Sequence, residues 1–223
     1  MALPAVWQLD AHTQAKHRIL EEYLKAWFPI LSRYNKRIVY IDGFSGPGIY
    51  KRGESGSPII ALRCLIDHSL NLCRERSGCE FVFFFIERNE ERVKILSDKI
   101  KEIFPDLPQN VNIHLENSEF DATMDPILTD LEKKGLNLAP TFTFIDPFGY
   151  GGLPFHIIRR ILSYNQCEVF INFAYDSINR FIEAKDSRET IFDDFFETKE
   201  WREIREIKDP DKRNASLTRL YTN

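Results

Sequence analysis

The chain has 223 residues, and its 30 Lys and Arg stand against 34 Asp and Glu, which gives a formal net charge of -4 at pH 7. This length fits one domain large enough to cover both faces of a sheet. The charge balance provides no overall basic field for nucleic acid, although a local basic patch stays open. There is neither a signal-peptide start nor an apolar run of membrane length, so we expect a cytoplasmic protein without membrane contact.

The four cysteines, Cys64, Cys73, Cys79 and Cys167, form no C-x-x-C pair. Three of them fall inside predicted helices or strands. We therefore expect reduced structural thiols, with no disulfide and no metal site.

Residues 10–34 form the first predicted element, a helix with one apolar stripe at steps of three and four residues, which Asp10 or Thr13 caps. A polar cluster of His12, Thr13, Lys16 and His17 lies at its start. Two interpretations are open for this cluster, a solvated helix end or a site at which Lys16 or Thr13 reaches a ligand carboxylate.

The next element is a strand that leads directly into a glycine-rich loop, over residues 37–48. Ile38 to Ile41 are apolar or aromatic, as expected of a central strand buried on both faces. Asp42 ends the strand. Gly43, Gly46 and Gly48 then allow the backbone to turn sharply and to approach a ligand closely.

The acid before this loop decides between ligands, because a carboxylate repels phosphate and attracts an ammonium group or a ribose hydroxyl. The spacing Asp42-x-Phe44-x-Gly46-x-Gly48 resembles the first motif of class I methyltransferases that use S-adenosyl-L-methionine (SAM), D-x-F-x-G-x-G. A dinucleotide loop would need glycine at Lys51, a nucleophile elbow would need glycine at Pro47, and a P-loop ending is absent. The alternative is a glycine turn that only connects a strand to a helix.

Ser57-Pro58 predicts a helix that starts with Ser57 as its cap and runs to about Cys73. The preceding loop, residues 49–57, is either a lid beside the ligand loop or an ordinary surface loop. A second apolar strand, residues 80–86, ends in Glu87, and a helix over 89–104 follows. Because parallel strands end at one crevice, Glu87 is placed to accept hydrogen bonds from both ribose hydroxyls of an adenosine; otherwise it is a helix-start charge.

A shorter third strand covers residues 112–115 and is followed by polar residues 117–121. In the resembled methyltransferases such groups commonly meet the adenine edge, and we select Ser118 as the candidate. A helix from about Asp125 to Lys134 follows, and Gly135 ends it.

The fourth strand, residues 141–145, delivers Asp146-Pro147-Phe148, and Asp146 is the third acid at a predicted strand end. This step resembles the fourth motif, D/N-P-P-Y/F, of methyltransferases that act on exocyclic amines, with one proline instead of two and the aromatic residue one position early. The resemblance implies that Asp146, Pro147 and Phe148 face the methyl acceptor. An Asp-Pro turn with Phe148 in the core is the alternative.

The rest of the chain reads as a helix over 153–164, a fifth strand over 168–173 and helices over 179–185 and 189–208. Asn172, Tyr175 and Asp176 close the fifth strand on the same predicted rim. The aromatic side of the 189–208 helix fits packing on the sheet or a partner better than stacking on bases.

Three landmarks together resemble the three-Cys-motif partner protein family: His12-Thr13-x-x-Lys16, the block from Tyr40 to Gly48 with Gly53-Glu54-x-Gly56-Ser57-Pro58, and Ile145-Asp146-Pro147-Phe148-Gly149. The match spans about residues 7 to 176. It implies a SAM-binding Rossmann-like domain that works beside a protein with three cysteines. Members of that family are normally longer, so we expect either a truncated chain or an incomplete sheet.

We therefore predict an α/β fold with a Rossmann-like, doubly wound, mostly parallel sheet of the class I methyltransferase type that lacks the terminal β-hairpin. One domain would hold the helix 10–34, a core over 37–176 and a helical segment over 177–223. The leading hypothesis is a SAM-dependent methyltransferase, with Lys16, Asp42, Gly43, Phe44, Gly46, Gly48, Glu87 and Ser118 at the cofactor and the acceptor, nucleic acid or protein, left open. The alternatives are a non-catalytic partner module and a nucleotide-binding protein.

Overall fold

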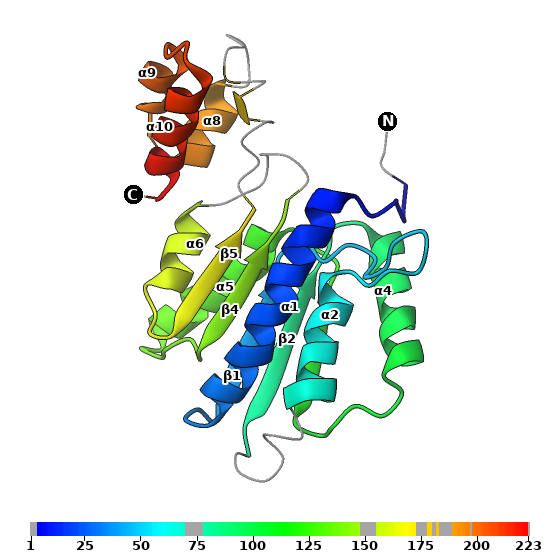
Figure 1. Cartoon of the computed structure of the whole chain (residues 1–223). Helices are drawn as coiled ribbons and strands as arrows, with labels where there is room; N and C mark the ends of the chain where they lie inside the picture. The colour runs from blue at the N-terminus through cyan, green and yellow to red at the C-terminus, as the bar shows by residue number, and fades with distance from the viewer. Residues whose placement is uncertain are drawn as a thin grey trace.

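A five-stranded parallel sheet forms the centre of the molecule in the computed structural model, which describes residues 4–69, 78–147, 155–172, 178–179, 182, 189–196 and 198–222. The strand order is β3-β2-β1-β4-β5, so the first strand is central (Figure 1). The strands are β1 Arg37–Asp42, β2 Glu80–Ile86, β3 Val111–Glu116, β4 Thr141–Ile145 and β5 Cys167–Ile171. The predicted α/β fold with a Rossmann-like sheet of the methyltransferase type is confirmed.

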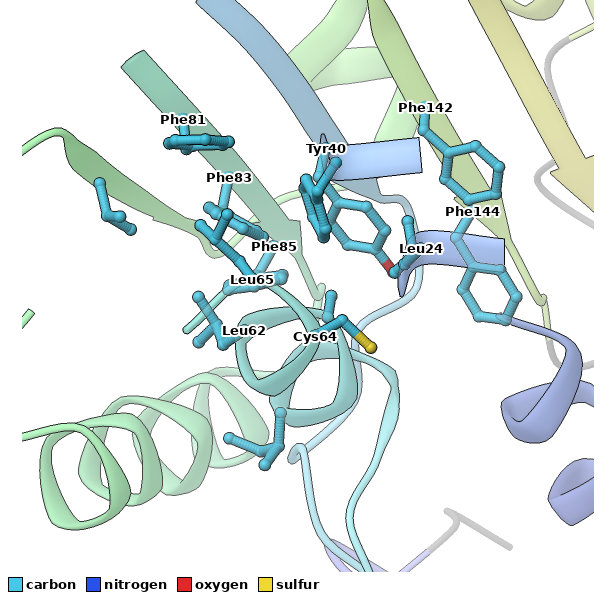
Figure 2. Close-up of a cluster of buried hydrophobic side chains, with 14 of the residues drawn as sticks. Leu24, Tyr40, Leu62, Cys64, Leu65, Phe81, Phe83, Phe85, Phe142 and Phe144 are labelled. Atoms are coloured by element: carbon cyan, nitrogen blue, oxygen red, sulfur yellow. The ribbon is translucent and has the colours of Figure 1, made fainter. Parts of the chain in front are cut away.

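Helices cover both faces of this sheet, because alternate residues of the buried strands point to opposite sides. On one face the side chains are mainly aromatic and pack against α1 Ala11–Ser32, α2 Ser57–Arg63 and α4 Glu90–Ile103 (Figure 2). The strand residues on this face include Tyr40, Phe81, Phe83, Phe85, Phe142 and Phe144. The opposite face has smaller side chains such as Val39, Ile41 and Val82, and it packs against α5 Phe120–Lys133 and α6 Phe155–Leu162.

Several helix ends agree with the local chemistry of the sequence. The Asp10 side chain accepts a hydrogen bond from the Thr13 N–H and so caps α1, and Asn89 caps α4 in the same way through Arg92 N–H. Gly135 follows α5 with a φ of 63°, the left-handed conformation expected after a helix end.

Two predicted helix starts are wrong. Gly56, and not Ser57, is the N-cap of α2, while Ser57 is the first helical residue. Helix α5 begins at Phe120, five residues before the predicted start, because Pro126 lies inside the helix instead of in its first turn. Phe120 is buried against Gly43 of the glycine loop. This tertiary contact sets the start of α5, which the sequence does not reveal because Pro126 suggests a later one.

The predicted helix that starts at Ser57 continues beyond Arg63 in a different form. Residues Cys64–Ser69 form the π-helical segment η1, which packs against α1, and the last residues up to Cys73 lie outside the described ranges. A π-helix adds one residue to each hydrogen-bonded turn, which local propensity does not reveal.

The single helix predicted over 189–208 is also wrong. The structure has α8 Glu189–Phe196 and α9 Trp201–Arg205, followed by α10 Pro210–Thr222. The chain folds back between α8 and α9, so that Trp201 packs against α8. The Trp201 Nε1–H donates to Asp193 Oδ1 at 2.9 Å, and its ring lies 5.1 Å from that of Phe192. Most of the predicted 179–185 helix and the end of the 168–173 strand lie outside the described residues.

Within the described ranges, no helix combines the length and apolar character needed to cross a lipid bilayer.

Candidate functional site

Three carboxylates gather at the carboxyl edge of the sheet. Asp42, Glu87 and Asp146 stand at or directly after the ends of β1, β2 and β4, which are neighbours in the sheet. Asp146 and Glu87 are both close enough to raise the pKa of Asp42 through their charge. The strand-end acids predicted from the sequence are therefore brought together.

Asp42 is the most deeply buried of the three, with no solvent exposure. Burial raises the pKa of its carboxyl to about 7, while the nearby Ser57 hydroxyl and the Phe44 N–H lower it in part. Oδ1 accepts the Phe44 N–H at 3.3 Å, whereas Oδ2 has no hydrogen-bond partner among the described residues. A buried oxygen of this kind is costly unless a further group donates to it.

Asp146 is held by two side chains from distant parts of the sequence. The Lys16 ammonium donates to both of its oxygens, at 2.7 and 2.5 Å, and the Asn172 amide donates to Oδ1 at 2.8 Å. The Lys16 and Asp146 side chains are only 13% and 17% exposed. Lys16 therefore reaches the predicted rim and forms an ion pair there, while its predicted role toward a ligand carboxylate stays a prediction.

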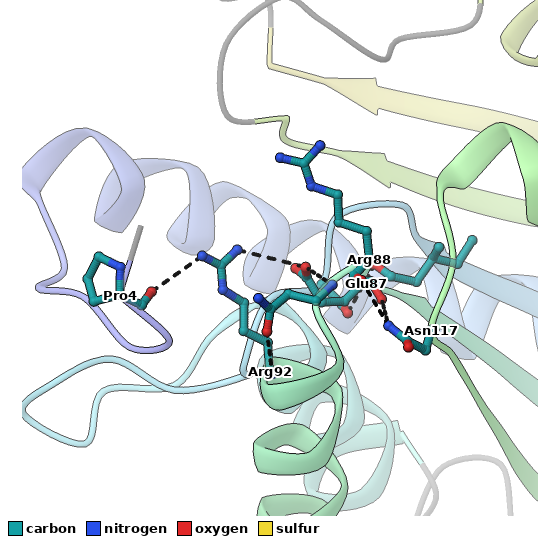
Figure 3. A network of polar contacts seen from close by, with 8 residues as sticks. Pro4, Glu87, Arg88, Arg92 and Asn117 are labelled. Carbon is teal, nitrogen blue, oxygen red and sulfur yellow. Dashed lines mark hydrogen bonds and ion pairs between the residues drawn. The ribbon is translucent and has the colours of Figure 1, made fainter. Parts of the chain in front are cut away.

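Glu87 is fixed by the start of α4 (Figure 3). Its Oε1 accepts the Asn89 N–H at 2.8 Å and lies 3.8 Å from the Arg92 guanidinium, and the Asn117 amide donates to its backbone carbonyl at 3.1 Å. The side chains of Glu87 and Arg92 are 7% and 9% exposed, so this ion pair is nearly shielded from water.

The glycine loop after β1 has the backbone geometry that its glycines suggested. Gly46 and Gly48 adopt positive φ angles of 59° and 71°. A Cβ at Gly48 would lie 2.5 Å from Leu96 Cδ1, and a Cβ at Gly46 would lie 3.3 Å from the Trp7 ring. Gly48 O accepts the Gly56 N–H at 2.7 Å, which ties the loop to the start of α2.

A cavity of about 30 Å³ lies between this loop and Asp146. Its lining includes Trp7, His17, Gly46 and Tyr50. The volume suffices for a water molecule or two, and ligand pockets are typically roughly 300–1,000 Å³.

His17 separates this small cavity from a larger one. The second cavity has a volume of about 440 Å³, lies between α1 and α2 with η1, and is lined by charged side chains of both signs, among them Arg18, Glu21 and Arg63. His17 lines both cavities, and burial lowers the pKa of its imidazole to about 4, so the ring is neutral at pH 7.

The remaining predicted site residues are placed less centrally. Phe44 is half-buried with its ring 6.4 Å from that of Phe120, and Ser118 is half-buried in the turn between β3 and α5. Pro147 is buried next to Asp146. Phe148, Tyr175 and Asp176 lie outside the described residues.

Two residues at the site escaped the sequence analysis, Trp7 and Arg92. The Arg92 guanidinium lies 4.9 Å from the centre of the Trp7 ring. Arg92 occupies the buried stripe of α4 together with Leu96 and Ile100, four and eight residues later. A charged residue on an apolar stripe is the signal that could have revealed Arg92; Trp7 stands alone before the first helix and gave no such signal.

In the described part of the chain, no three His, Cys, Asp or Glu side chains are grouped so that they could hold a metal ion. The rim instead offers carboxylates, a glycine-rich backbone and a neutral imidazole. These groups can bind a cation, accept hydrogen bonds from hydroxyls and orient a ligand.

No family model matches the chain, and no curated protein matches it, so membership of the three-Cys-motif partner family is not shown. Among solved structures, the chain is similar to Trm1 from Pyrococcus horikoshii in complex with S-adenosyl-L-methionine, with 13% identity and a TM-score of 0.40. The match covers 74% of this chain and 39% of that one. A likeness of this degree supports no functional assignment.

Proposed function

We propose that the chain binds SAM at the carboxyl edge of β1 and β2 and acts as a SAM-dependent methyltransferase. The observation that carries this proposal is the convergence of Asp42, Glu87 and Asp146 beside the glycine loop. A rim with three carboxylates favours a ligand that carries positive charge and hydroxyl donors, and it disfavours nucleoside phosphates.

The residues present fit such a ligand chemically. The unpaired Asp42 Oδ2 needs a donor or a positive charge, and SAM carries an ammonium, a sulfonium and two ribose hydroxyls. Glu87 would hold the ribose hydroxyls, the backbone at Gly46 and Gly48 would lie against the ligand, and Ser118 would meet the adenine edge.

The cofactor, when bound, supplies a methyl group already activated by the sulfonium. The task of the chain is then to orient donor and acceptor in line and to exclude water. Asp146, which lines the small cavity beside the glycine loop, would face the acceptor together with Pro147. The methyl acceptor, nucleic acid or protein, is left open.

One observation favours a second function, a non-catalytic SAM-binding module that serves a partner such as a protein with three cysteines. Asp146 already carries hydrogen bonds from Lys16 and Asn172. A carboxylate engaged in this way has less capacity left for the amine of an acceptor.

The first test is calorimetric titration of the purified chain with SAM and with its demethylated product, S-adenosylhomocysteine. We expect both to bind, and we expect Glu87→Gln to weaken binding at least tenfold, because hydrogen bonds to a charged group contribute about 1.5–3 kcal/mol. Glu91→Gln, an exposed carboxylate on the first turn of α4, is the matched control and should bind like the wild type. Equal affinities of the two variants would remove Glu87 from the site, and no binding by the wild type would refute the proposal.

The second test separates the catalytic from the non-catalytic function by transfer of a labelled methyl group to nucleic-acid and protein pools. For the enzyme, Asp146→Asn should bind SAM and lose most of the transfer. If the wild type binds SAM and labels neither pool, the binding module is favoured.

A further inference from the structure

The N-terminal segment Pro4–Leu9 is tied down across the proposed cofactor site. The Lys51 N–H donates to the Trp7 carbonyl at 2.9 Å, and the Arg92 guanidinium donates to the Pro4 carbonyl at 3.3 Å (Figure 3). The Trp7 ring meets the Tyr50 ring edge-on, with 5.9 Å between centroids. The segment is thus held by the loop after β1 and by α4 at once.

The side chains that make these contacts occupy the space between the glycine loop and Glu87, where a bound nucleoside would lie. Trp7 lies against Gly46 at one end, Arg92 lies over the Trp7 ring at 4.9 Å, and Arg92 reaches Glu87 at 3.8 Å. Among the described residues, the cavity beside the loop has a volume of about 30 Å³, which is too small for a nucleoside. A nucleoside that spans from the loop to Glu87 therefore cannot enter unless Trp7 moves.

The groups that occupy this space carry the same chemistry as the proposed ligand. A rim of carboxylates selects a cation, and the chain supplies two of its own, Arg92 toward Glu87 and Lys16 toward Asp146. The indole of Trp7 adds a flat aromatic ring, the counterpart of a purine. Arg92 stacks on this ring, which strengthens the arrangement through cation–π attraction.

From this correspondence we infer that segment Pro4–Leu9 is an autoinhibitory strap, an internal ligand that closes the cofactor site and that SAM must displace. The inference rests on the proposed function. SAM and the strap compete, so the observed dissociation constant equals the intrinsic one divided by the fraction of molecules in the open state. Weakening the strap must then tighten SAM binding, which is the opposite of what loss of a ligand contact does.

The experiment compares the full chain with Trp7→Ala by titration with SAM and S-adenosylhomocysteine, and it follows hydrogen exchange at the Lys51 amide. Gln8→Ala, an exposed neighbour in the same segment, is the matched control. We expect Trp7→Ala to bind about tenfold tighter and Gln8→Ala to bind like the wild type. The Lys51 N–H should exchange slowly in the free wild type, and faster both in Trp7→Ala and in the wild type saturated with S-adenosylhomocysteine.

Equal or weaker binding by Trp7→Ala would overturn the inference and make Trp7 a spectator or a ligand contact, while the proposed function would stand. Binding of SAM by neither protein would overturn both. Because Trp7→Ala must be folded for the comparison, its thermal melt is recorded, and Trp7→Phe, which keeps a smaller ring, should give an intermediate affinity. A Trp7→Phe affinity outside the range between wild type and Trp7→Ala would also count against the strap.

Discussion

At the scale of single residues, the carboxylate rim contains one carboxyl group, that of Asp42, which is buried without a hydrogen bond from the described residues to each of its oxygens. Asp42 has no solvent exposure, one unpaired oxygen and a pKa raised to about 7. Replacement by a neutral residue would remove this cost of burial. Retention of an acid here is consistent with a role in ligand binding, because buried groups with raised pKa values are concentrated at functional sites.

Asp42 should make the stability of the chain depend on pH. Since the folded pKa lies above the unfolded value of 3.8, the folded state binds more protons between about pH 4 and 7, and the free energy of unfolding falls as pH rises through that window. Asp42→Asn should abolish this fall and exceed the wild type at pH 8 by up to about 4 kcal/mol, with the difference vanishing near pH 4.

The measurement is urea unfolding of both proteins at several values from pH 4 to 8. Asp98→Asn, on the exposed side of α4, serves as control and should keep the wild-type profile. A wild-type stability that does not fall between pH 4 and 7 would contradict this assignment of Asp42.

The sequence predicted the strand-end acids because position alone places them, since every parallel strand of an open sheet delivers its last residue to the same edge. It could not predict the strap. Trp7 and Arg92 are 85 positions apart and meet only through tertiary packing, and the bond between Lys16 and Asp146 likewise joins residues 130 positions apart.

At the scale of elements, the connection from β1 to α2 is the part of the site with the strictest steric demands. Gly48 and Gly53 both have positive φ, 71° and 87°, but they differ in surroundings. A Cβ at Gly48 would lie 2.5 Å from Leu96 Cδ1 on α4, whereas nothing lies within 4 Å of a Cβ at Gly53.

This difference makes Gly53→Ala the matched control for Gly48→Ala. Both substitutions place an alanine at a positive φ angle, which lowers the free energy of unfolding by about 1–2 kcal/mol. Gly48→Ala adds the overlap with Leu96, for a further loss of about 1–3 kcal/mol. Chemical denaturation of the two variants measures the difference in stability, and equal stabilities would show that the Leu96 side chain moves away from the loop without cost.

The same scale shows where helix prediction fails. Asn89 and Asp10 carry their capping information in their own side chains, so the starts of α4 and α1 were predictable. The break between α8 and α9 depends instead on the hydrogen bond from Trp201 to Asp193. In one continuous helix these residues, eight positions apart, would lie more than two turns from each other.

At the scale of the whole molecule, the two faces of the sheet are separate cores, and Cys64 and Cys79 lie in the aromatic one. Each is 1% exposed, and burial raises the pKa of the Cys64 thiol to about 12. Thiols of this kind react only when the structure opens.

We expect iodoacetamide at pH 8 to alkylate Cys64 and Cys79 slowly and at the same rate, because one cooperative opening exposes both. Cys167, half-buried on β5, should react sooner. Peptide mass spectrometry over a time course resolves the individual sites. Much faster labelling of Cys64 than of Cys79 would mean that η1 opens independently of the sheet.

The strand order has a consequence for biosynthesis. The central strand β1 pairs with β2 on one side and with β4, about a hundred residues later, on the other. During translation the edge of β1 that pairs with β4 therefore stays unpaired until Thr141–Ile145 has left the ribosome. The sheet can therefore be completed only after β4 has emerged, and until then the nascent chain is exposed to mispairing along this flank of β1.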